Sequence, residues 1–224
     1  MRKVVNLLKN RDVGAIGIGA MIVFIAMVLV AGIAASVLIQ SSGRLETQAM
    51  QSGQETIAEV SSGLSVFDIV GKKNTDLQYL GITVRARAGA PDIDINETVI
   101  LISEGTTKTL LTYDGYTNAQ HYNNSANDTN GQIFATNTWS DLTAETFGII
   151  VLQDEDSSVS QTTPIVNKGD KVILCLCFGA AAALGSEIAE RKDVFGRVIP
   201  EVGSPGIISF TTPAAYNDGI MDLQ

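Results

Sequence analysis

Two pairs of aspartates have the spacing of metal ligands. Asp92 and Asp94 occupy alternate positions, although Glu97 stands where a calcium loop of the EF-hand kind needs glycine. Asp154 and Asp156 occupy alternate positions in a second acidic stretch, ahead of a serine-rich loop. Either pair can hold calcium, which would also relieve repulsion between acidic chains, and the competing interpretation is an ordinary solvated acidic loop. The four aspartates are therefore candidate calcium ligands, and no other cofactor is expected.

The sequence contains no set of residues with the spacing of a catalytic site. Its single histidine, His121, lies in a polar segment and leaves little for acid–base catalysis. There is no Gly-x-Ser-x-Gly turn and no glycine loop that cradles phosphate. Cys175 and Cys177 would share one face of a strand, with Cα atoms near the limit for a disulfide. We expect buried free thiols, no zinc site and no enzyme.

Three Asn-x-Ser/Thr sequons offer attachment points for N-linked glycans, at Asn96, Asn123 and Asn127. The last two lie in a polar stretch with no large aliphatic side chain to draw it inward. Glycans on that stretch must face outward, which would make residues 114–131 an outer surface. The alternative is a solvated loop without sugar.

Residues 15–43 carry no charge and lie between Asp12 and Arg44. At about 1.5 Å per residue, residues 16–39 make a helix of roughly 36 Å, enough to cross a hydrocarbon core of about 30 Å. The helix would be apolar on every face, which is typical of a helix buried on every face. Interspersed small residues let neighbouring helices approach closely. The side chains predicted to form a helical core are Ile18, Ile22, Phe24, Ile25, Leu29, Val37 and Leu38.

Residues 1–14 are short and basic, with four basic side chains and one acidic side chain. By the positive-inside rule this end stays cytoplasmic and the chain after Arg44 lies outside. An ordinary secretory signal has the same order of parts and would be cut near Ala34 or Ala35. However, the apolar run is longer than the usual core of about 7 to 15 residues in such a signal.

The charge balance is typical of an exported surface protein. The chain has 15 basic and 24 acidic residues, a net charge of −9. Removing residues 1–14 takes away four basic residues and one acidic residue and makes the net charge −12. This balance argues against nucleic acid as a partner, since its binders carry a basic patch.

Beyond residue 44 the pattern changes from helix to strand. Residues 44–64 have apolar side chains at helical spacing and continue the helix in amphipathic form, until the Ser61–Gly63 cluster and then Gly71–Asn74 mark the change. Residues 181–190 are ambiguous between loop and short helix. Short β-type runs suggest an antiparallel sandwich. The candidate strands are residues 77–88, 98–103, 107–113, 146–153, 171–178 and 206–212.

Asp12-Val13-Gly14 followed by AIGIGAMIVFIAMVLVAGIAASVLIQSSG resembles the amino-terminal signature of archaeal flagellins, or archaellins. The tail VIPEVGSPGIISFTTPAAY, from Val198 to Tyr216, also resembles that family. The resemblance implies that a prepilin-peptidase-like membrane protease cuts between Gly14 and Ala15, so that the apolar helix is retained. Type IV pilins usually carry Glu as the fifth mature residue, where this chain has Gly19. The resemblance also implies an immunoglobulin-like β-sandwich.

The expected fold class is therefore α+β, a long hydrophobic amino-terminal α-helix followed by an antiparallel immunoglobulin-like β-sandwich. Residues 1–14 are expected to be a cleaved prepilin-type signal, 15–64 the filament-core helix and membrane span, and 65–224 the outer domain. The implied function is a subunit of the extracellular archaellum filament for swimming motility. An adhesion pilin or membrane-anchored adhesin is the alternative.

The resemblance also implies the partners of the chain. They are copies of the chain itself and related archaellins, the protease, the membrane before assembly, and the archaellum motor and platform proteins. No nucleic acid is among them.

Overall fold

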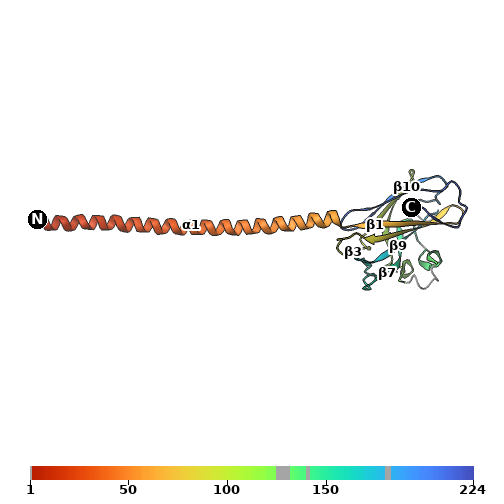
Figure 1. The fold of residues 1–224 in the computed structure, drawn as a ribbon, viewed down its shortest axis with the longest axis horizontal. Helices are drawn as coiled ribbons and strands as arrows, with labels where there is room; N and C mark the ends of the chain where they lie inside the picture. The colour runs from red at the N-terminus through yellow and green to blue at the C-terminus, as the bar shows by residue number, and fades with distance from the viewer. Residues whose placement is uncertain (1, 125–131, 140–141, 180–182) are drawn as a thin grey trace. The chain divides into compact units, whose positions relative to one another are not determined.

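The structure, a computed structural model, describes residues 2–124, 132–139, 142–179 and 183–224, with side-chain surroundings from residue 14 onward. It divides into two compact units, Met1–Gln54 and Glu55–Gln224. The first unit is entirely helical over its described residues, whereas the second contains the end of the helix and all the strands. Figure 1 labels the principal elements.

Helix α1 is continuous from Arg2 to Ser61. Its sequence is rich in residues that favour a helix and has no proline, so nothing interrupts the backbone ladder. Polar side chains in its second half bond to neighbouring turns, as when Thr47 Oγ1 donates to the carbonyl oxygen of Gly43 at 2.9 Å. At the end, Gly63 has φ of +122° and a Cβ there would collide with the backbone of Ser204. A glycine is therefore required where the helix gives way to the first strand.

The strands follow in one run of sequence with three short 3₁₀ turns, Ala119–His121, Ile133–Ala135 and Asn137–Trp139. The strands are β1 (Leu64–Lys73), β2 (Leu77–Ala86), β3 (Ile93–Asp94), β4 (Val99–Ser103), β5 (Lys108–Tyr113), β6 (Tyr122–Asn123), β7 (Thr146–Gln153), β8 (Ile165–Val166), β9 (Lys171–Cys177), β10 (Asp193–Ile199), β11 (Gly206–Thr211) and β12 (Ile220–Asp222).

Ten of these strands form a sheet in the order β11-β10-β4-β5-β7-β9-β2-β1-β12, with β6 paired to β7. The neighbours are antiparallel except that β5 and β6 each run parallel to β7. Strands β3 and β8 make a separate antiparallel pair. The sheet folds over on itself, because Gly63, just before β1, pairs with Ser204, just before β11. The result is two layers enclosing a core.

The main core lies between these layers and is aliphatic. Ile100 and Ile102 of β4 and Ile208 of β11 meet Ile82 of β2 and Leu174 of β9, and all five are fully buried. In β11 buried and exposed residues alternate strictly, as expected of a strand with one solvated face. Strand β9, in contrast, is buried over five consecutive residues, so both of its faces are covered.

A second cluster covers the outer face of β7 and β9. Trp139 is 5% exposed and packs with Ile150, Ile173 and Cys175. Its indole Nε1 donates to the carbonyl oxygen of Ile133 at 2.9 Å, which satisfies the one polar atom of the ring. The segment that contains Trp139 is therefore held against the sheet by both packing and a hydrogen bond.

The long apolar helix and the mostly antiparallel β-structure confirm the expected fold class. All six predicted strands are present, as β2, β4, β5, β7, β9 and β11. The other six strands, β1, β3, β6, β8, β10 and β12, were not predicted. The Gly71–Asn74 boundary was wrong because Gly71 to Lys73 belong to β1. The described residues 183–190 contain no helix, which resolves that ambiguity in favour of a loop.

Replacing Trp139 by alanine should lower the free energy of unfolding of the β-unit by about 3–5 kcal/mol, because a large buried ring and its hydrogen bond are lost together. The measurement is urea unfolding of the detergent-solubilised chain, followed by circular dichroism. The matched control is Phe195→Ala, since Phe195 is 57% exposed and its loss should change stability by no more than about 0.5 kcal/mol. Equal effects of the two substitutions would contradict the role assigned to Trp139.

Candidate functional site

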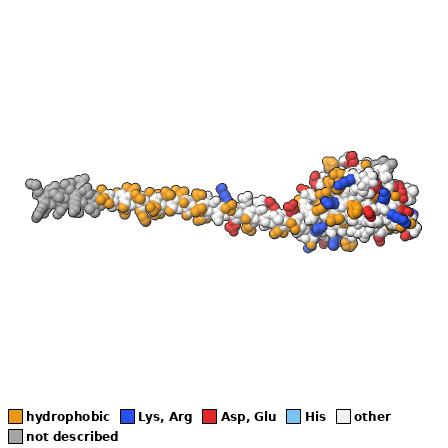
Figure 2. Space-filling model, turned by 90° about the horizontal axis from the view of Figure 1, so that it is seen from above, with side chains coloured by type: hydrophobic (Ala, Val, Ile, Leu, Met, Phe, Trp, Pro, Cys, Tyr) orange, Lys and Arg blue, Asp and Glu red, His pale blue; other side chains and the backbone are white. Residues whose placement is uncertain are grey.

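The apolar surface of α1 has no partner within the described chain. The residues predicted for a helical core are all exposed, from 56% for Ile25 to 70% for Leu38. Ile18, Ile22 and Ile25 lie along one side of the helix, while Phe24 and Leu38 point to other sides, as the helical period requires. Figure 2 shows hydrophobic side chains along the described part of the apolar stretch of α1. The helix thus presents an apolar surface in every direction.

By length and composition, the helical stretch Gly14–Ser61 is capable of crossing a membrane. Its glycines have open surroundings, since a Cβ added at Gly17, Gly19 or Gly32 would meet nothing within 4 Å. No contact with a described residue therefore requires these glycines. Their small size would let the backbone of a neighbouring helix approach closely.

The predicted cleavage point lies within α1. Gly14 and Ala15 are both exposed, and a Cβ at Gly14 would meet nothing within 4 Å. The bond between them is part of the helical backbone. The cut after Gly14 stays a prediction.

The two sequon asparagines that the structure describes, Asn96 and Asn123, lie in different surroundings. Asn96 is exposed in the turn between β3 and β4, where its backbone N–H donates to Asp94 Oδ1 at 2.8 Å. The hydroxyl of the same sequon belongs to Thr98, which is fully buried and donates to the carbonyl oxygen of Asp94. Asn123 is half-buried in β6, and Asn127 lies outside the described residues. Glycosylation at these sites stays a prediction.

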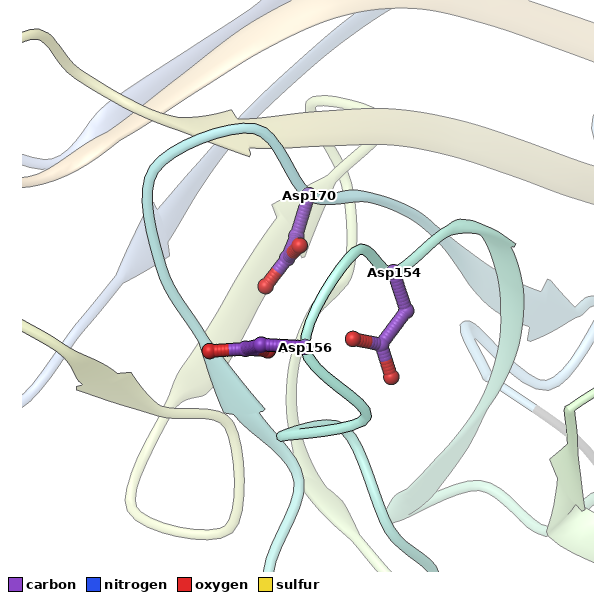
Figure 3. Close-up of side chains that lie close together, drawn as sticks. All are labelled: Asp154, Asp156 and Asp170. Carbon is purple, nitrogen blue, oxygen red and sulfur yellow. The ribbon is translucent and has the colours of Figure 1, made fainter.

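One of the two aspartate pairs is joined by a third carboxylate. One oxygen from each of Asp154, Asp156 and Asp170 lies within 4.8 Å of the other two. Figure 3 shows these side chains together, two from the loop after β7 and one from the turn before β9. Among the described residues this is the only such acidic group, so Asp92 and Asp94 do not contribute to it.

Hydrogen-bond donors from the surrounding loops stabilise the three carboxylates. Asp170, only 1% exposed, accepts from the backbone N–H of Asn167 at 3.0 Å and from Ser158 Oγ at 3.3 Å. Asp154 accepts from the backbone N–H groups of Ser158 and Val159, both at 3.2 Å. The carboxylate oxygens of Asp154 and Asp170 thus face hydrogen-bond donors of the surrounding loops.

Asp156 shows the electrostatic result of these contacts. Hydrogen bonds from Ser158 and from the Asn167 side chain lower the pKa of the Asp156 carboxyl below its usual value. A carboxyl with a lowered folded-state pKa stabilises the fold above its unfolded pKa and loses that effect as the pH falls. The arrangement is suited to a hard cation such as calcium, and it also forms a satisfied polar turn without one. Calcium binding here stays a prediction.

His121 is buried, contrary to its expected place in a solvated loop. It is 1% exposed, with Nδ1 3.5 Å from Asp114 Oδ2 and Nε2 3.3 Å from Asn118 Nδ2. Its role is to anchor the Ala119–His121 turn beside β7, where the chain passes close to Gly148. No second histidine exists to extend it into a catalytic pair.

Both cysteines are free thiols on the outer face of β9, as expected. Cys175 is fully buried, and burial raises its pKa well above the usual value. Cys177 is partly buried, and burial together with the charge of Glu187 raises its pKa to about 11. At neutral pH neither thiol is a nucleophile, because the thiolate is the reactive form.

These features agree with the result of the family comparison. A family model for archaeal-type flagellin matches residues 14–210. The chain belongs to this family. Its members are structural filament proteins, so the chain is a subunit of the archaeal flagellar filament and not an enzyme. The alternative of an adhesin is not favoured.

Individual relatives match over nearly the whole chain. The chain is 46% identical to flagellin B2 of Methanocaldococcus jannaschii, covering 96% of this chain and 95% of that protein. It is 39% identical to flagellin B3 of Methanococcus voltae, covering 98% and 99%. Family membership is thus supported by matches over nearly the whole chain.

Two solved structures resemble the fold. The crystal structure of archaeal flagellin FlaB1 from M. jannaschii has a TM-score of 0.64 at 27% identity, covering 73% of this chain and 97% of that chain. The archaeal flagellum of Methanospirillum hungatei strain JF1 gives 0.59 at 17% identity, covering 92% and 98%. The second likeness is one of fold alone.

Replacing Asp170 by asparagine should lower the free energy of unfolding by about 1–3 kcal/mol, because an amide nitrogen would face backbone donors in a buried place. The measurement is urea unfolding, with calcium and with a chelator. If the cluster binds calcium, the ion should stabilise the unaltered chain and not the variant. Asp92→Asn is the control, since Asp92 is exposed and outside the cluster. Equal stabilisation of all three chains by calcium would contradict a site at Asp170.

Proposed function

We propose that this chain is made as a membrane-embedded precursor, cut between Gly14 and Ala15, and polymerised through residues 15–64 into an extracellular filament. The proposal rests on family membership together with one observation, the exposed apolar surface of α1. The β-unit then forms the outer part of the filament.

The apolar surface sets the energetic limits of the proposal. Between Ala15 and Ile39 there are 15 Ile, Val, Leu, Met or Phe side chains. At about 1.5–3 kcal/mol for each buried side chain, exposing them to water would cost roughly 20–45 kcal/mol. Only a lipid bilayer or a bundle of like helices removes this cost. Transfer from the membrane to the filament exchanges one apolar environment for another.

The proposed partners follow from this route. A prepilin-peptidase-like protease removes residues 1–14 and leaves the apolar stretch in the mature chain. Motor and platform proteins of the archaellum then supply the energy for insertion and rotation, since the sequence has no phosphate-binding glycine loop of its own. The acidic balance of the chain speaks against nucleic acid as a partner.

Gly14→Val should block cleavage, because a branched side chain would occupy the position just before the cut. The precursor should remain in the membrane, and no filaments should form. Intact mass and amino-terminal sequencing of the surface protein provide the measurement, and mass beyond the polypeptide would report on Asn96, Asn123 and Asn127. The control is the unaltered chain, which should begin at Ala15. Normal filaments from the Gly14→Val chain would contradict the proposed cut.

Ile25→Glu should permit cleavage and prevent assembly, because a carboxylate in the middle of an apolar bundle has no partner. In the membrane the same substitution costs about 2.5–3.5 kcal/mol on insertion scales, which a long apolar span tolerates. The expected result is a mature chain in the membrane fraction and none in sheared filaments. Ile25→Leu keeps the apolar surface and should assemble normally. Assembly of the glutamate variant would argue against a helix-bundle core.

A further inference from the structure

The β-unit is acidic overall but contains a cleft with basic side chains around it. Its volume is about 640 Å³, and its lining includes Arg85, Arg87, Lys168 and Lys171. Arg85 and Arg87 come from the end of β2 and the residues after it, whereas Lys168 lies in the turn before β9 and Lys171 is the first residue of β9. Residues 65–224 have 10 basic and 20 acidic side chains. Four of those ten cations therefore surround a single cleft.

The cations of the cleft have no acidic partner within the described chain. No carboxylate of a described residue lies within 4.0 Å of them, and Arg85 instead lies over the Phe67 ring at 5.4 Å from its centroid. The one acid in the lining, Asp170, is 1% exposed and accepts hydrogen bonds from Asn167 and Ser158. The cations of the cleft are thus available to pair with a carboxylate of another molecule.

The floor of the cleft suits the approach of a helix. Between the cations the lining consists of small residues, among them Ala88, Gly89 and Gly169. Such residues leave room for the backbone of a second element, whereas larger side chains would hold it away. The cleft also lies beside the end of α1, because the backbone N–H of Arg87 donates to the carbonyl oxygen of Gly63 at 3.0 Å.

The helix end at residues 55–61 has the complementary properties. Glu55 and Glu59 are four residues apart and share one side of the helix. Ile57 and Val60 are 68% and 71% exposed and lie on the opposite side of the helix, so they do not compete with the glutamates for this contact. Within the described part of the chain, the Glu59 carboxylate makes no recorded hydrogen bond or ion pair.

We infer that in the filament this cleft receives residues 55–61 of a second copy of the chain, with the carboxylate of Glu59 paired to its basic rim. The inference rests on the proposed polymerisation through α1, which brings helices of neighbouring copies to the side of the β-unit where α1 ends. The contact is heterologous, since a cleft meets a helix, and heterologous contacts that do not close into a ring generate helical filaments.

The acidic loop at Asp154 and Asp156 is a less suitable occupant. Its carboxylates already accept hydrogen bonds from Ser158, Val159 and Asn167 of the same chain. Pairing them with a neighbour would break those bonds. The helix end requires no such exchange at Glu59.

The test is charge reversal at Lys168, an exposed residue of the cleft rim. Lys168→Glu should reduce the amount of sheared filament at least about tenfold, because each subunit repeats the repulsive contact along the polymer. Filaments that do form should dissociate at a lower temperature. Lys192→Glu makes the same change in net charge at an exposed position outside the cleft, and it should assemble like the unaltered chain.

The reciprocal variant identifies the partner. Glu59→Lys alone should also impair assembly, and the double variant Lys168→Glu with Glu59→Lys should restore it. Equal impairment by Lys192→Glu, normal assembly of Lys168→Glu, or failure of the double variant to restore filaments would each overturn the inference.

Two controls separate this inference from the proposed function. Mature amino termini of the variants and the circular dichroism of their β-units must match the unaltered chain, so that processing and folding are not the cause. If the unaltered chain itself forms no filaments through α1, the proposed function fails. If it forms them and Lys168→Glu does so equally, only the contact at the cleft is wrong.

Discussion

The structure depends on one constraint, that the apolar surface of α1 cannot be buried within a single chain. An amphipathic helix of a globular protein buries its single apolar face against its own domain. In this chain, by contrast, residues 15–43 have exposed apolar side chains on every side of the helix. A lipid bilayer or a bundle of like helices can cover such a surface. The proposed route from membrane to filament uses both environments in turn.

The β-unit is self-sufficient in a way that the helix is not. Its two layers enclose an aliphatic core, and the Trp139 segment covers the second face of β7 and β9. A sheet buried on both sides tolerates the continuous apolar run of β9, which would be exposed in a simple two-layer sandwich. The unit therefore buries most of its apolar side chains within itself, and its net negative charge favours solubility. In the proposed filament the helix supplies cohesion and the β-unit supplies the surface.

Sequence patterns predicted the elements that depend on local periodicity and missed those that depend on tertiary contacts. The length of the apolar run was sufficient to predict α1. Alternating or continuous apolar residues between turn residues were sufficient to predict six strands. Strand β1 was missed because its end, Gly71 to Lys73, has the composition of a turn, although Gly71 packs closely against Leu77. Asp170 was missed because it lies fourteen positions after Asp156 in sequence, with β8 between them. The burial of His121 was missed because its neighbours in sequence are polar, and the burial comes from the tertiary fold.

The distribution of aromatic side chains has a consequence for how the two parts of the molecule are observed. Residues 2–61 contain no tryptophan or tyrosine, whereas the single tryptophan, Trp139, is buried in the β-unit with its ring centroid 5.6 Å from that of Tyr79. Intrinsic fluorescence is therefore blind to the packing of the helices and sensitive to the state of the β-unit. Loss of the polymer and melting of its subunits are optically separable events in this protein, since light scattering follows the first and tryptophan emission the second.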